Sequence, residues 1–173
     1  MLTGSAVRLA LRELTALGIG LKWPNDVLAR SASDREWGKV AGILCNATSG
    51  GHSTVVIGIG INVHQRVEQL PVDTATSLAL CGVDMRCEDV IVAVLEQLAA
   101  AQRTWDSSDC DDSYRAACIT IDQQVKVQLS CDEIASGRAI DVDVMGRLVV
   151  DTPAGRVLHT VGDVIHVRHS EGE

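Results

Sequence analysis

The sequence predicts an α+β protein, in which a mixed or antiparallel sheet with packed helices is followed by a small β-barrel. Apolar residues recur at helical spacing over residues 2–17 and 88–105. Between these stretches, the strand-like runs 39–46 and 54–63 are separated only by a Gly-rich turn. That adjacency is typical of an antiparallel meander rather than of βαβ units. From Ile119 onward the apolar period changes to two, which predicts the short strands of a barrel.

Composition excludes several classes of protein. The chain has 173 residues, 46% of them hydrophobic, and a formal net charge of -8. This hydrophobic content is enough for a folded core and argues against wholesale disorder. The negative charge argues against non-specific nucleic-acid binding, although a local site for one small anion stays open. Aromatic residues make up only 2%, which argues against a platform that stacks nucleobases.

Targeting and cysteine patterns predict a cytoplasmic protein with no membrane association. The sequence does not open with a basic leader and an apolar core, and no apolar run approaches the length of a membrane span. Its cysteines form no Cys-x-x-Cys pair, so free thiols are expected and neither a disulfide framework nor a zinc site is predicted. They are Cys45, Cys81, Cys87, Cys110, Cys118 and Cys131.

The first half of the chain alternates apolar elements with polar turns. The predicted helix 2–17 is followed by Gly18, which supplies a stop. Pro24 lacks a backbone donor, so it marks the end of a strand that turns into a loop. Residues 27–29 form a short predicted strand, and the polar stretch 30–37 forms a predicted loop.

The second half begins with the helix 88–105 and a further predicted helix at 109–117, with Asp109 as its N-cap. The period of two then predicts strands at 125–129, 140–144, 148–150 and 164–167. We expect a domain boundary near Cys118, which divides the chain into domains at 1–118 and 119–173.

Two glycines interrupt the clearest strand of the sequence. Successive side chains of a strand face opposite ways, so one face is apolar and is expected to join a core. It consists of Val55, Ile57, Ile59, Ile61 and Val63. The other face has bare glycines and ends in an amide: Val56, Gly58, Gly60 and Asn62. It predicts either a floor for a flat ligand or the close packing of a helix, and glycines taken alone favour the helix.

The segment Lys22-Trp23-Pro24-Asn25-Asp26 combines a cation, an indole, an amide and a carboxylate. A phosphate-bearing ligand needs charge neutralisation and ring contact, and sometimes a carboxylate for its metal ion. An ordinary Pro-Asn turn beside a surface ion pair explains the same residues equally well.

Lys39 stands at the mouth of an otherwise apolar strand. It could hold a carboxylate or phosphate against a hydrophobic pocket, with Gly42 leaving room for the ligand. A lysine that extends to solvent from a strand end is the more common arrangement. The five histidines show no visible pairing with a Ser or Cys nucleophile, so we expect them to be structural or exposed.

Taken together, three blocks resemble the biotin protein ligases (biotin–[acetyl-CoA-carboxylase] ligases), in that family's order and nearly its spacing. They are Lys22-Trp23-Pro24-Asn25-Asp26-Val27, Lys39-Val40-Ala41-Gly42-Ile43-Leu44 and Val56-Ile57-Gly58-Ile59-Gly60-Ile61-Asn62-Val63. Downstream, the segments 137–141, 146–148 and 162–164 look like the family's SH3-like C-terminal domain. The resemblance implies a class II synthetase-like catalytic fold, incomplete at its N-terminus, before that domain. Lipoate ligation on a related fold is disfavoured by this tail.

The resemblance implies ATP-dependent attachment of biotin to a lysine of a biotin carboxyl carrier domain, through biotinyl-5'-adenylate and with Mg²⁺. Lys39 matches the family lysine beside the biotin carboxylate and the α-phosphate. Asp26 matches a carboxylate that orients a lysine or binds magnesium. The other biotin- and ATP-binding positions implied are Lys22, Trp23, Asn25, Gly42, Gly58, Gly60 and Asn62.

The sequence also departs from the family. The Gly-Arg-Gly-Arg-x-Gly loop, the upstream Ser-Thr-Asn segment and the N-terminal helix-turn-helix have no counterpart in it. Without the helix-turn-helix, we expect no nucleic-acid partner. The resemblance implies a carrier domain of acetyl-CoA carboxylase or a related carboxylase as the acceptor. A homodimer is a candidate assembly. The alternative is a truncated, non-catalytic remnant or a partner-binding module.

Overall fold

The computed structural model describes residues 1–173 except 32–35, 49–53, 104–111, 129–133, 161 and 167–173. The chain forms two compact units. One contains Leu2–Leu21 and Asn25–Thr104, and the other contains Met1, Lys22–Pro24 and Trp105–Glu173. Among the described helices, none is long and apolar enough to cross a lipid bilayer.

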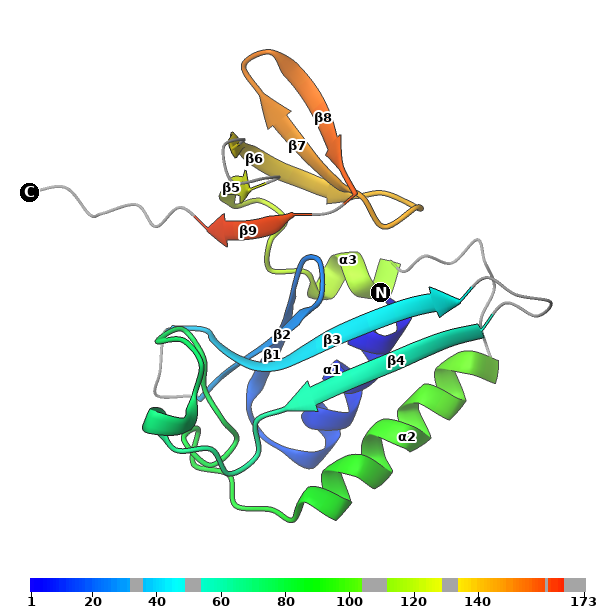
Figure 1. Ribbon diagram of the computed structural model, residues 1–173, viewed down its shortest axis with the longest axis vertical. Coiled ribbons are helices and arrows are strands. Elements are labelled where there is room, and N and C mark those ends of the chain that lie inside the picture. The colour runs from blue at the N-terminus through cyan, green and yellow to red at the C-terminus, as the bar shows by residue number, and fades with distance from the viewer. Residues whose placement is uncertain (32–35, 49–53, 104–111, 129–133, 161, 167–173) are drawn as a thin grey trace, which may run out of the picture. The chain divides into compact units, whose positions relative to one another are not determined.

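The sheet of the first unit has four strands in the order β1-β2-β3-β4 (Figure 1). These are β1 (Gly18–Lys22), β2 (Asp26–Arg30), β3 (Gly38–Thr48) and β4 (Thr54–Ile61). Strand β3 pairs antiparallel with both β2 and β4, which confirms the predicted meander. A register shift interrupts the β2–β3 pairing between Val27 and Leu28.

Two α-helices, which pack against each other, and the short 3-10 helix η1 (Val67–Gln69) complete this unit (Figure 1). Helix α1 (Leu2–Leu14) buries its small and aliphatic face, including Val7 and Leu11. It ends three residues before the predicted end at residue 17, where the Thr15 hydroxyl donates to the Leu11 carbonyl at 2.7 Å, a local bond that competes with the helix. Helix α2 (Cys87–Arg103) contacts α1 through Gln97, whose amide donates to both Glu13 carboxylate oxygens at 2.9 Å.

The prediction that one whole face of β4 joins a core is wrong. Val55 and Ile57 are 58% and 42% exposed, and burial on that face is reached only at Val63, beyond the end of the strand. Strand β4 is the edge of the sheet, with β3 as its partner within the described residues. The buried core of this unit lies instead on α1 and on strands β1 to β3, where Leu21, Val27 and Val40 are almost fully covered.

The second unit contains α3 (Asp112–Ala117) and an antiparallel sheet in the order β8-β7-β6-β5-β9. Its strands are β5 (Gln124–Gln128), β6 (Ile134–Val142), β7 (Leu148–Thr152), β8 (Gly155–His159) and β9 (Asp163–His166). Strand β8 was not expected. The predicted N-cap of α3, Asp109, lies outside the described residues.

The five strands form an open sheet rather than the closed barrel predicted, because β8 and β9 stand at opposite edges and no described pairing joins them. The inward positions follow the predicted period of two, and Val125, Val127 and Val150 are buried. The first residue of β8, Gly155, has a φ of 117°, a conformation that favours glycine, so its turn brings β8 back onto β7.

Candidate active site

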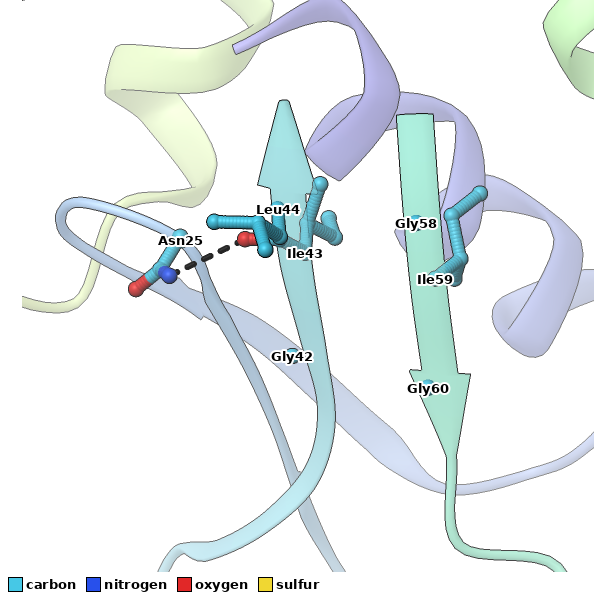
Figure 2. A pocket seen from close by; sticks show the side chains of 7 residues that line it. All are labelled: Asn25, Gly42, Ile43, Leu44, Gly58, Ile59 and Gly60. Carbon is cyan, nitrogen blue, oxygen red and sulfur yellow. Dashed lines mark hydrogen bonds between the residues drawn. The ribbon is translucent and has the colours of Figure 1, made fainter. Parts of the chain in front are cut away.

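A pocket of about 440 Å³ lies over strands β3 and β4, within the size range of small-ligand sites. Figure 2 shows Gly42 on β3 and Gly58 and Gly60 on β4 as bare positions on neighbouring strands, with Asn25 beside them. The lining residues are Asn25, Gly42, Ile43, Leu44, Gly58, Ile59 and Gly60. Four of them were predicted as site residues; Ile43, Leu44 and Ile59 were not.

The two glycines of β4 face open space. A Cβ added at Gly60 would meet only the Gly42 carbonyl oxygen at 4.0 Å, and one at Gly58 only the Leu44 carbonyl oxygen at 3.7 Å. Both neighbours are backbone of the paired strand β3, since Gly60 pairs with Gly42 and Gly58 with Leu44. No helix atom of the described residues lies within 4 Å of either position. Close packing of a helix therefore does not explain these glycines in the described part of the chain.

Lys39 and Asp26 form an ion pair next to the pocket. The Lys39 Nζ lies 2.5 Å from the Asp26 Oδ1, and the side chains are 40% and 16% exposed. The Asp26 Oδ1 is buried and has no hydrogen-bond partner of standard geometry among the described atoms, so the ammonium is its close partner. A Cβ at Gly42 would lie 3.5 Å from the Lys39 Nζ, which places the lysine over this bare position. The structure thus brings Asp26, Lys39 and Gly42 together.

Asn25 and Asn62 hold backbone around this group. The Asn25 side-chain amide donates to the Ile43 carbonyl at 2.9 Å (Figure 2), and the Ile43 N–H donates back to the Asn25 carbonyl at 2.9 Å. The Asn62 side-chain amide donates to the Thr76 carbonyl at 2.9 Å and to the Lys39 carbonyl at 3.5 Å. Asn62 does not line the pocket, so its observed contacts anchor the chain around Lys39.

Lys22 and Trp23 belong to the other compact unit. Trp23 is only 2% exposed. Its backbone N–H donates to the Thr120 hydroxyl at 3.1 Å, and its indole N–H donates to the Gly146 carbonyl at 2.8 Å. Both donors of Trp23 are therefore used within that unit. The peptide bond between Trp23 and Pro24 is cis.

Sequence and structure comparisons connect this geometry to a family. Residues 120–167 match the family described as "Biotin protein ligase C terminal domain". Over 152 residues the chain is 39% identical to the biotin–[acetyl-CoA-carboxylase] ligase of Mycobacterium tuberculosis. The chain is related to the biotin protein ligases. The match covers 86% of this chain and 53% of the relative, so the chain spans about half the length of that biotin ligase.

Solved biotin protein ligases share the fold. The enzyme from Aquifex aeolicus in complex with biotin and ATP matches with a TM-score of 0.74 and 24% identity, covering 96% of this chain and 69% of that one. The Leishmania major biotin protein ligase in complex with biotinyl-5-AMP matches with a TM-score of 0.52 and 21% identity, covering 92% and 69%. At these identities the likeness shows the fold alone. It confirms the predicted α+β class with helices on an antiparallel sheet.

Proposed function

We propose that this chain provides the adenylate-binding side of a biotin protein ligase, which attaches biotin to a lysine of a biotin carboxyl carrier domain. We also propose that the protein acts in the cytoplasm. The observation that carries it is the bare face of Gly42, Gly58 and Gly60, which is open and which no described helix explains. Glycines at such positions let a flat ligand touch the backbone of a sheet. The 39% identity to a biotin–[acetyl-CoA-carboxylase] ligase supports this ligand class.

The first step joins two anions. A carboxylate oxygen of biotin attacks the α-phosphorus of ATP, the bond to the bridging oxygen breaks, and pyrophosphate leaves with biotinyl-5'-adenylate as product. The negative charges repel each other, so a fixed cation near the forming bond lowers the barrier. Lys39 supplies that cation in the proposal, and its ion pair with Asp26 fixes the ammonium over Gly42. Asp26 therefore acts by orienting Lys39.

The second step transfers the acyl group. The lysine amine of the carrier domain attacks the carbonyl carbon of the mixed anhydride, an amide forms, the amine releases a proton, and AMP leaves. The backbone of β3 and β4 keeps the adenylate in place during this attack. Asn25 stabilises that surface because its side chain and its backbone both bond Ile43.

Magnesium enters the proposal only with ATP. The described residues contain no group of three His, Cys, Asp or Glu side chains that could hold a metal ion. Asp26 is the carboxylate beside Gly42, and Lys39 already engages it. These described residues do not form a metal site of their own. Mg²⁺ commonly binds through substrate phosphates with few protein ligands.

Biotin-dependent exchange of pyrophosphate into ATP tests this function. It should be measured for this chain and for a longer form that adds the segment present in the M. tuberculosis relative. We expect Lys39→Ala to reduce exchange by about a hundredfold. The matched control is Lys126→Ala, since Lys126 is an exposed lysine on β5, and it should exchange like the wild type. Absence of exchange in both forms would refute the proposal.

A non-catalytic, partner-binding role is the second candidate. The exposed apolar side chains of the edge strand β4, such as Val55 and Ile57, favour it. Calorimetry with a non-hydrolysable biotinyl-adenylate analogue separates the two. Binding that Lys39→Ala abolishes and Lys126→Ala preserves supports the enzyme, whereas no binding to either form of the chain supports the partner-binding role.

A further inference from the structure

A cysteine, a histidine and an aspartate lie in a row at the start of helix α2, and none of them lines the pocket. The Cys87 Sγ lies 3.8 Å from the His64 Nδ1, within hydrogen-bond distance for sulfur. On the other side of the ring, the His64 Nε2 lies 3.9 Å from the Asp84 Oδ1. The sequence analysis found no histidine paired with a nucleophile. Residues 64 and 87 are 23 positions apart, and only the tertiary structure brings them together.

Two segments far apart in the sequence bring these groups together at the surface. His64 follows β4, Asp84 lies in the segment before α2, and Cys87 is the first residue of the 17-residue helix. All three residues are exposed. Reagents in solution can therefore reach the sulfur, unlike that of the buried Cys118.

The order of the three groups matches an activated nucleophile. A cysteine reacts as its thiolate, and an imidazole nitrogen beside the sulfur can take the proton. The Asp84 carboxylate lies beyond hydrogen-bond distance of the Nε2, so it acts on the ring through its negative charge, which favours the form that carries the proton on Nε2 and leaves Nδ1 toward the sulfur.

The other charged residues at this helix end are Arg86, Glu88 and Asp89. Arg86 donates to both Asp89 carboxylate oxygens, at 3.1 and 2.7 Å, so its cation is already paired. Glu88 is exposed and adds one negative charge in the first turn. His64 is thus the group of the described residues that the structure places against the sulfur.

We propose that Cys87 is a modification site that forms mixed disulfides with low-molecular-weight disulfides. In this exchange His64 Nδ1 takes the Cys87 proton, the thiolate attacks one sulfur of the disulfide, and the old S–S bond breaks. The departing thiolate takes the proton back from the imidazolium, so the products are the mixed disulfide and one free thiol. This site is independent of the proposed ligase function.

Peptide-resolved mass spectrometry of iodoacetamide labelling, at one fixed pH, tests the proposal on the intact chain. Cys45 is the internal control, since it is exposed on β3 and no histidine partner is recorded for it among the described residues. We expect Cys87 to be labelled about tenfold faster than Cys45. His64→Gln should bring Cys87 to the rate of Cys45, and Asp84→Asn should produce an intermediate rate.

Asp73→Asn, a change at an exposed loop aspartate, should leave both rates unaltered. An unchanged Cys45 rate in every variant shows that the fold is preserved. Incubation with oxidised glutathione should then add its mass to the Cys87 peptide before the Cys45 peptide. Equal labelling of the two cysteines in the wild type, or a Cys87 rate that His64→Gln does not change, would overturn the proposal.

Discussion

The ammonium of Lys39 lies 2.5 Å from the buried Oδ1 of Asp26, over the position where Gly42 has no side chain. This pair joins strands β2 and β3, whose register places Asp26 opposite Gly42. The lysine ammonium lies within ordinary contact distance, 3.5 Å, of the position that a Gly42 Cβ would take. The ion pair thereby fixes the Lys39 ammonium beside the pocket, where it can neutralise a bound carboxylate or phosphate.

Asp26→Asn should reveal whether Asp26 orients Lys39 for catalysis or mainly stabilises the fold. Because the Lys39 side chain is 40% exposed, solvent screens the pair and the free energy of unfolding should change by less than about 1 kcal/mol. The freed lysine loses its fixed position, so pyrophosphate exchange should decrease by about ten- to a hundredfold. Denaturant unfolding and exchange kinetics check the two effects. A loss of stability that fully accounts for the lost exchange would contradict an orienting role.

Gly60→Val should remove ligand binding without harming the fold. The added Cβ would meet only the Gly42 carbonyl oxygen at 4.0 Å, and glycine within a strand itself costs about 0.5–1 kcal/mol. We expect an unchanged or higher unfolding free energy. The valine would fill the bare face, and steric conflict should weaken binding of an adenylate analogue by about ten- to a hundredfold.

Gly137→Ala is the matched control for that experiment. A Cβ there would collide with the Asp151 backbone oxygen and lie 2.7 Å from the Val150 Cγ1. This variant should lose about 1–3 kcal/mol of stability because β6 and β7 cannot both keep their positions. If Gly60→Val lowered the unfolding free energy as much as Gly137→Ala does, that result would contradict the open space above Gly60.

Trp23→Phe should destabilise the unit that contains Thr120 and Gly146. The indole N–H donates to the Gly146 carbonyl at 2.8 Å, and the residue is only 2% exposed. Phenylalanine cannot donate, so we expect a loss of about 1–3 kcal/mol in thermal or urea unfolding. Trp37→Phe is the control: this half-buried ring contacts the Arg30 guanidinium at 4.6 Å, and its loss should cost less than about 1 kcal/mol.

Stability should decrease at alkaline pH in a way that depends on Cys118. Burial raises the pKa of the Cys118 thiol, because the interior disfavours the thiolate. The folded pKa lies above the unfolded one, so the stabilisation is complete below the unfolded value, about 8.5, and is lost as the pH rises through the folded value. Cys118→Ala should flatten the dependence of unfolding free energy on pH above about 8.5. Cys45→Ala, at an exposed thiol, should leave that dependence as in the wild type.

Local patterns predicted much of the fold because they depend on near neighbours. The period of two predicted β5 and β7, and helical spacing predicted α1 and α2 within a few residues of their ends. The strand β8 was missed because its two apolar side chains, Val157 at 40% and Leu158 at 48% exposure, are adjacent and both exposed, so the sequence shows no alternation there. Asp122 has a φ of 68°, a left-handed conformation that is uncommon outside glycine and that no local pattern of the sequence predicted.

The sequence by itself determined the residue types of the site and their strands: three glycines on paired strands, a lysine at a strand mouth and a carboxylate after a turn. Only the tertiary structure decided which of them meet. The β2–β3 register brought Asp26 to Gly42, and the same folding placed Trp23 in the other unit. It also brought His64 to Cys87 across 23 residues. Contacts between distant residues depend on register and packing, which no local pattern encodes.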